Sequence, residues 1–353
     1  MAACTGCSAN LTGGELFCPY CGTSAPGAST AAPEAAGELR AKSADGGATG
    51  FGREVRTFSC NTCGATVSWD PMKLASTCAY CGSATVVEAP AGDESRPARV
   101  VPFALDAPAA EQRFRSWLGK GWFRPRDLST SSIVGEMRGV YLPFWAFDAD
   151  ADSDWTASAG YNYQEQEAYT ATENGKLVAR TRTVTKTRWQ PARGTHREHY
   201  DDWMIAATKG VDAPLLAKIF PYRTNEARPY DAAYLAGFGA ERPAMRADDV
   251  RQNAANALYQ KEVEACGKMV PGDTHRDLAV STRFSNWAYD LVLLPLWISS
   301  YRYRDQPYRF LINGQTGEVQ GHAPISKARV ALAVAIAIGA AATVAIVLGI
   351  LKG

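Results

Sequence analysis

Nine cysteines occur in the chain, and eight of them form four Cys-x-x-Cys pairs. Ten residues separate the first two pairs and fourteen separate the last two. Two such pairs, returned to one point by a short hairpin, supply the four thiolates of a tetrahedral zinc site. The spacing therefore predicts two zinc ions in two zinc ribbons, one held by Cys4, Cys7, Cys18 and Cys21 and the other by Cys60, Cys63, Cys78 and Cys81.

Other uses of paired cysteines remain as alternatives. A disulfide framework is disfavoured in a reducing compartment, and a thioredoxin-like redox pair needs a single pair in a βαβ setting. Glycine follows the last cysteine of three pairs, as a chain that wraps around a metal requires. The ninth cysteine, Cys266, lies in a predicted helix and is expected to be a small buried apolar residue.

Residues 330–351 carry no charge, and a helix of this length would be about 33 Å long, enough for a hydrocarbon core of about 30 Å. The run predicts a C-terminal transmembrane helix, with a buried core helix as the alternative. Lys327 and Arg329 precede it, which places the N-terminal domain in the cytoplasm. We expect a single-pass, tail-anchored protein of the cytoplasmic (inner) membrane, with homo- or hetero-oligomerisation through the helix.

Composition shifts divide the rest of the chain. Residues between the two cysteine regions are almost all Ala, Gly, Ser, Thr and Pro, which is typical of a flexible linker. The expected organisation is a first zinc ribbon at 1–22, a linker at 23–52, a second ribbon at 53–87, a linker at 88–98, a middle domain at 99–322, a juxtamembrane tether at 323–329 and the transmembrane helix at 330–351.

The expected fold class is α+β, with a mostly antiparallel sheet and a few helices in the middle domain. Helices are predicted at 107–120, with Asp106 as N-cap, at 213–220 and at 246–268. Extended segments begin at the similar sequences 141–145 and 293–297, and the stretch 313–317 predicts a hairpin.

Two charged faces are predicted on strands of the middle domain. Asp148, Asp150, Asp152 and Asp154 alternate, as do Arg180, Arg182, Lys186 and Arg188. The simplest reading is a solvated sheet face with the acidic and basic strands side by side. The alternatives are a calcium site on the aspartates and an anionic-lipid or partner surface on the basic strand.

Charge and motifs disfavour nucleic-acid binding and catalysis. Residues 1–24 contain one glutamate and no cation, and residues 53–88 sum to zero, so the ribbons cannot neutralise phosphates. Aromatic side chains expected to be exposed there, at Phe17, Tyr20, Trp69 and Tyr80, favour a protein partner. No nucleotide-binding or hydrolase motif occurs, and the pair His196 and His199 is expected at the surface, so we expect no enzyme.

The paired ribbons, the segments 141–148, 230–238 and 293–297, the stretch 313–317 and the apolar C-terminal run together resemble a known family. It comprises bacterial zinc-ribbon single-pass membrane proteins, the YdjG-like proteins, often labelled as relatives of primosomal protein N′, the replication-restart helicase. The resemblance implies partnership with SPFH-domain (flotillin-like) or phage-shock-type membrane-stress proteins. The expected function is therefore a membrane-anchored zinc-ribbon adaptor that recruits cytoplasmic proteins, with a membrane-tethered nucleic-acid-binding protein as the alternative.

Overall fold

The computed structural model describes nearly all residues from 95 onward and short segments before them. The described residues are 2–5, 10–11, 16–18, 23–26, 35, 37–42, 56–60, 66–69, 86–88, 95–134, 137–173, 176–208, 211, 213–304 and 306–352. The side chains of residues 2, 10, 56–60, 66–69, 86–88, 133, 171–173, 176, 213–214, 217, 307, 342–343 and 345–352 are outside the description.

The chain divides into two compact units, and three of its segments contribute to each. Unit 1 comprises residues 1–44, 145–205 and 247–290. Unit 2 comprises residues 45–144, 206–246 and 291–353. Each unit is described by itself below.

Unit 1 is built from long strands and one long helix. The strands are β9 (Arg138–Glu173), β10 (Lys176–Ala206) and β13 (Thr274–Tyr303), of which unit 1 holds residues 145–173, 176–205 and 274–290. Helix α4 (Ala247–Met269) buries a row of side chains spaced four residues apart, which share one face of a helix. The row consists of Val250, Ala254, Leu258, Glu262 and Cys266.

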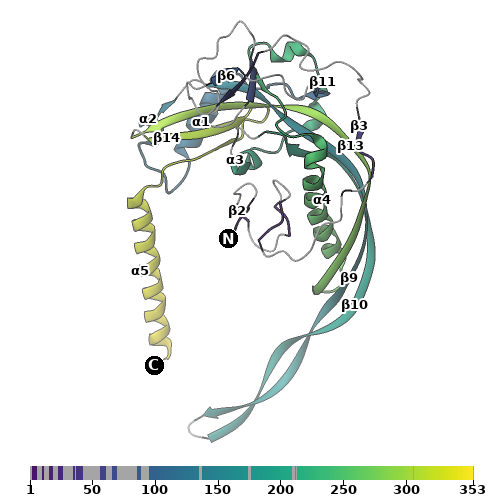
Figure 1. The fold of residues 1–353 in the computed structure, drawn as a ribbon. Helices are drawn as coiled ribbons and strands as arrows, with labels where there is room; N and C mark the ends of the chain where they lie inside the picture. Colours follow the sequence, from purple (N-terminus) through teal and green to yellow (C-terminus); the bar gives the residue numbers. More distant parts are fainter. Residues whose placement is uncertain are drawn as a thin grey trace. The chain divides into compact units, whose positions relative to one another are not determined.

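Beyond the start of β13, strands β9 and β10 continue as a two-stranded ribbon (Figure 1). We call residues 161–188 of this ribbon the arm. The amide of Asp273, just before β13, donates to the carbonyl of Gly160 at 2.8 Å, which marks where the arm begins. Asn174-Gly175, a dipeptide typical of two-residue hairpin loops, separates the two strands in the sequence.

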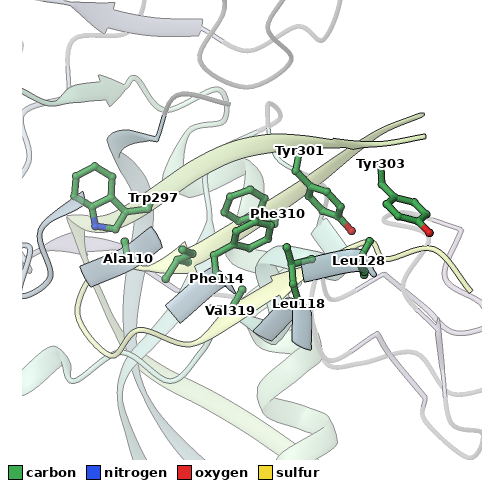
Figure 2. Packing of buried hydrophobic residues seen from close by; sticks show 10 residues of the cluster. Ala110, Phe114, Leu118, Leu128, Trp297, Tyr301, Tyr303, Phe310 and Val319 are labelled. Atoms are coloured by element: carbon green, nitrogen blue, oxygen red, sulfur yellow. The ribbon is translucent and has the colours of Figure 1, made fainter. Parts of the chain in front are cut away.

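Unit 2 packs two helices onto a hairpin. Helices α1 (Ala107–Gly119) and α2 (Leu128–Ser131) lie against β13, β14 (Gln306–Asn313) and β15 (Val319–Gly321). Figure 2 shows Phe114 of α1 stacked on Phe310 of β14 in the buried cluster. The predicted N-cap is confirmed, because the Asp106 carboxylate accepts from the amide of Ala109 at 2.9 Å. The predicted hairpin is confirmed by the pairing of β14 with β15.

The remaining elements are short. In unit 1 they are β1 (Ala2–Ala3), β2 (Asn10–Leu11) and β3 (Arg40–Ala41). In unit 2 they are β4 (Arg56–Cys60), β5 (Thr66–Trp69), β6 (Val86–Glu88), β7 (Arg99–Val100), β8 (Ile133–Val134), α3 (Ala213–Lys218), η1 (Thr224–Glu226), β11 (Arg228–Pro229), η2 (Ala232–Leu235), β12 (Gly239–Glu241) and α5 (Lys327–Lys352).

The predicted fold class needs correction. Thirteen of the described strands form one large mixed sheet, with few helices, instead of a mostly antiparallel domain separate from a second ribbon. Strand β12 runs parallel to β9 and antiparallel to β5, so strands of the predicted second ribbon join the sheet. Strand β13 also pairs in parallel with β7 and with β3. The short strands in these parallel pairs are distant in the sequence from the long strands that they join, as parallel pairing requires. Local sequence patterns do not reveal such pairings.

The prediction for residues 330–351 is also corrected. Among the fully described residues, no helix is both long and apolar enough to cross a bilayer. The transmembrane helix, the tail-anchored topology and the single-pass inner-membrane localisation are corrected by this finding. The alternative of a buried core helix fails too, since Leu332, Ile336 and Ile338 of α5 are all more than half exposed.

Candidate metal centres

The first predicted zinc site lies between two short hairpins. Strands β1 and β2 pair antiparallel on either side of the first Cys-x-x-Cys pair. On either side of the second pair, Phe17 bridges to Ser24, and the amide of Ala25 donates to the carbonyl of Leu16 at 2.9 Å. Cys4 therefore directly follows the first strand of one hairpin, and Cys18 directly follows the bridge residue Phe17 of the other, positions that suit the first cysteine of a zinc-ribbon pair.

The two described thiols of this site are brought together. Cys4 and Cys18, one from each hairpin, are buried in the same small cluster with Leu11 and Ala25. The amide of Cys18 donates to the carbonyl of Thr23 at 2.7 Å, which closes the turn that begins at this cysteine. Four thiolates suit Zn²⁺, and the two described thiols fit such a site. Cys7 and Cys21 lie outside the described residues.

This first module is fastened to helix α4 of unit 1. The Gln260 side-chain oxygen accepts from the amide of Leu16 at 3.0 Å, and the Phe17 ring packs edge-on against Tyr259 with ring centroids 6.2 Å apart. The expectation that Phe17 is exposed is wrong, because its ring is buried against that helix. The side chains of Tyr20, Trp69 and Tyr80 lie outside the description.

The second predicted site falls in a three-stranded part of unit 2. Strands β4 and β5 pair antiparallel from Arg56↔Trp69 to Ser59↔Thr66, and β6 pairs antiparallel with β4 at Cys60↔Val86. Cys60 ends β4, at the edge of the connection to β5. Cys63, Cys78 and Cys81 lie outside the described residues, and the structure describes only the backbone of Cys60.

The acidic and basic faces do not pair as the simplest interpretation predicts. Strands β9 and β10 are neighbours, but the aspartates of β9 face the C-terminal half of β10. The Arg197 guanidinium lies 3.4 Å from the Asp152 carboxylate, and His199 Nδ1 lies 2.6 Å from the Asp150 carboxylate. The cations at the N-terminal half of β10 face glutamates in the arm instead, with Lys186 Nζ 3.2 Å from the Glu165 carboxylate.

One acidic cluster of unit 1 already contains a cation. Asp148, Asp201 and Asp202 offer carboxylates close to one another, and the Lys42 ammonium lies 2.5 Å from Asp148 and 3.0 Å from Asp202. Burial and the neighbouring carboxylates raise the pKa of Asp201. Of the four alternating aspartates, only Asp148 belongs to this cluster, and a lysine takes the place that calcium would need.

A second polar cluster of unit 1 is buried and surrounds Glu262. Its carboxylate accepts from Ser153 Oγ at 2.6 Å and from Tyr200 OH at 2.7 Å, and His196 Nδ1 lies 2.9 Å away. Cys266, one helical turn further along α4, is fully buried as predicted. Burial, together with the Glu262 charge, raises the pKa of the Cys266 thiol to about 11.

Sequence reasoning did not find this cluster. It placed His196 at the surface, whereas the His196 side chain is only 18% exposed and reaches the buried Glu262. The usable signal was a glutamate on the same four-residue row as Val250, Ala254 and Leu258, since a charged residue on a buried helix face needs a partner. Treating His196 and His199 as one surface pair was wrong for His196, because residues three apart in a strand point to opposite faces.

Comparisons with known proteins give one relative. The chain is 29% identical over 242 residues to a protein of Bacillus subtilis (strain 168) described as uncharacterized protein YdjG. The match covers 67% of this chain and 66% of that protein, just under two thirds of the length of the relative. No protein-family model matches the sequence, and no solved structure matches the chain.

Proposed function

We propose that this chain is a non-enzymatic zinc-ribbon adaptor that binds a protein partner through the arm. By the resemblance to YdjG-like proteins, the partner is a scaffold protein of the SPFH (flotillin-like) or phage-shock class. The observation that supports this proposal is the arm itself, a two-stranded ribbon whose side chains are exposed on both faces. Residues 162–166 are all exposed, and consecutive strand residues point to opposite faces.

An isolated two-stranded ribbon is at best marginally stable in water, so a long one gains stability from a partner. Its unpaired edges also offer main-chain groups to another chain. Apolar side chains are unusually exposed along the arm: Tyr163, Tyr169, Val178 and Leu177, the last at 77%. These features favour protein binding.

One face of the arm combines aromatic rings with paired charges. Tyr163, Glu165, Glu167 and Tyr169 alternate on β9 and therefore share a face. Lys186 Nζ lies 3.0 Å from the Glu167 carboxylate, whose pKa is lowered by hydrogen bonds from Lys186 and Arg182. The charged side chains on this face already form ion pairs with one another. The two tyrosines are therefore the side chains whose burial by a partner would contribute most to the free energy of binding.

The test is a binding measurement between the purified full-length chain and purified scaffold proteins of the SPFH-domain and phage-shock classes, each measured separately. The double substitution Tyr163→Ser and Tyr169→Ser should weaken binding by about tenfold or more, since buried aromatic residues dominate protein interfaces. The matched control, Gln164→Ser with Gln166→Ser, changes the opposite face of the same strand and should leave the dissociation constant unchanged.

Two outcomes count against the proposal. If neither scaffold class binds the wild-type chain, the partner is not of this kind. If the tyrosine variant and the glutamine variant bind equally well, the arm face is not the binding surface. Loss of binding on replacing Cys4 and Cys18 by serine, with the tyrosine variant unaffected, would place the surface on the first module instead.

A further inference from the structure

We propose that His196, Glu262 and Cys266 form a binding site for one divalent transition-metal ion of the zinc class, separate from the cysteine ribbons. The site lies in unit 1, where α4 supplies Glu262 and Cys266 and β10 supplies His196. One ligand atom from each of the three residues lies within 4.8 Å of the other two.

The geometry needs little rearrangement to take an ion. Ligand atoms about 2.1 Å from a tetrahedral metal lie roughly 3.4 Å from one another. His196 Nδ1 and a Glu262 carboxylate oxygen are already 2.9 Å apart. Glu262 and Cys266 are four residues apart on one face of α4, so a helix holds two of the three ligands in fixed register.

The donor set selects the class of metal. A thiolate, an imidazole and a carboxylate are ligands that Zn²⁺ and its first-row neighbours accept together, whereas Ca²⁺ and Mg²⁺ prefer oxygen atoms alone. Three protein ligands leave a fourth position, and the Tyr200 hydroxyl, 2.7 Å from the other Glu262 oxygen, lies next to the ligand set. The ion expected here is therefore held by three protein ligands, unlike an ion held by four cysteines.

Burial supplies the second argument. Glu262 and Cys266 are both 0% exposed, and Cys266 belongs to a buried cluster with the apolar Trp155 and Ala157. Burying a carboxylate lowers the free energy of unfolding by several kcal/mol unless an opposite charge and hydrogen bonds compensate it. If the contact served stability alone, apolar side chains of similar volume would often serve as well. A divalent cation neutralises this charge directly. Ser153, which donates to Glu262 and also lies 2.7 Å from Thr282 Oγ1, then orients the carboxylate as a supporting hydrogen bond.

The neighbouring acidic cluster of unit 1 provides a comparison. Asp148, Asp201 and Asp202 converge in a similar way, but Lys42 binds Asp148 and Asp202 and already supplies the positive charge. No lysine or arginine ion pair to Glu262 occurs among the described residues, and its contacts there are with His196, Tyr200 and Ser153. Of these two described clusters, the Glu262 cluster is therefore the one that combines soft and hard ligands and contains no lysine or arginine.

The test measures all first-row metals bound per chain in the purified full-length protein by mass spectrometry. His196→Gln and Cys266→Ala should each lower the bound metal by one ion per chain relative to the wild type. The double variant should lose no more than either single variant, because both residues hold the same ion. His199→Gln, on the same strand but contacting Asp150, is the matched control and should keep the wild-type content.

The proposal is overturned if His196→Gln, with a wild-type circular dichroism spectrum, binds as much metal as the wild type. His196 is only half-buried, so this variant is expected to fold even if Cys266→Ala does not. A loss of two ions in the double variant would equally contradict a single shared site. Replacing Cys4 and Cys18 by serine should leave the metal lost in His196→Gln unchanged, which separates this site from the first ribbon.

Discussion

Asn313 and Glu262 are polar side chains without solvent exposure, and each is held by several hydrogen bonds. Asn313 Oδ1 accepts from the amides of Gln315 and Thr316 at 2.9 Å, and its Nδ2 donates to the carbonyl of Ile219 at 3.0 Å. The same side chain thus forms the hairpin turn and joins it to the segment after α3. A buried amide can make both kinds of bond, whereas a carboxylate only accepts.

Asn313→Asp should therefore destabilise unit 2. The substituted oxygen would face the carbonyls of Ile219 and Pro221, which also need donors. We expect the free energy of unfolding to fall by about 2–5 kcal/mol in urea denaturation at pH 7. Gln306→Glu, the same chemical change at an exposed position of the same strand, should cost less than about 0.5 kcal/mol. Equal effects of the two changes would contradict the role given to Asn313.

His199 provides a titration at neutral pH. The hydrogen bond that His199 donates to the Asp150 carboxylate, together with the negative charges of Asp150, Asp148 and Asp201, raises the pKa of His199 above its usual value. The His199–Asp150 pair therefore makes its full contribution to stability at pH values below about 6.5, the pKa of histidine in the unfolded chain. This contribution is lost as the pH rises through the higher pKa of His199 in the folded chain. Because the His199 side chain is 63% exposed, the effect on stability is small and the titration is the better readout.

Proton NMR of the imidazole should give His199 a pKa above 6.5 in the wild type. Asp150→Asn should lower this pKa toward the ordinary value. The Asp152→Asn variant, which changes the partner of Arg197, should leave it nearly unchanged. A His199 pKa that does not respond to Asp150→Asn would show that the contact is absent in solution.

At the scale of elements, turn residues predicted the hairpin after β14, whereas the cysteine spacing predicted one hairpin between the first two pairs and the described pairings flank each pair instead. The contact of the first module with α4 was not predictable, because Phe17 and Tyr259 are far apart in the sequence and no local pattern links the two residues. The docking makes metal removal testable through α4. If zinc holds the two hairpins together, its loss should release Leu16 and Phe17 from the helix.

Treatment of the full-length chain with a strong chelator should therefore increase hydrogen exchange of residues 16–18 and 23–26. The Leu16 amide is the best single reporter, since it donates to Gln260. The Cys4→Ser and Cys18→Ser double variant should exchange as fast without chelator. Residues 107–119 of α1, in unit 2, provide the internal control and should exchange as before. Unchanged protection of residues 16–18 after chelation would argue against a zinc-dependent module.

At the scale of the whole molecule, the balance of charge argues against nucleic acid. Lys and Arg number 37 and Asp and Glu 36, so the net charge is +1. Within the described part, cations such as Lys42 and Lys186 lie against carboxylates. Phosphate binding depends on cations that remain available at the surface.

The full-length chain should accordingly fail to retard double-stranded or single-stranded DNA at physiological salt. Lowering the salt should produce only weak binding without sequence preference, because it would rest on a few cations. A known DNA-binding zinc protein serves as the positive control for the gel. Retardation at 150 mM salt by the wild type, lost on replacing Cys60 and Cys63, would instead favour the nucleic-acid alternative.

The sequence by itself determined the local features of this protein. The cysteine pairs, the Asp106 cap and the 313–317 hairpin depend on neighbours in the chain, so their residue types are visible as patterns. Only the tertiary structure decided which distant segments meet. The mixed sheet joins β12 with β5 and β9, and the Glu262 cluster joins three strands with one helix. Such contacts depend on the burial and register of whole elements, a property that no short segment carries.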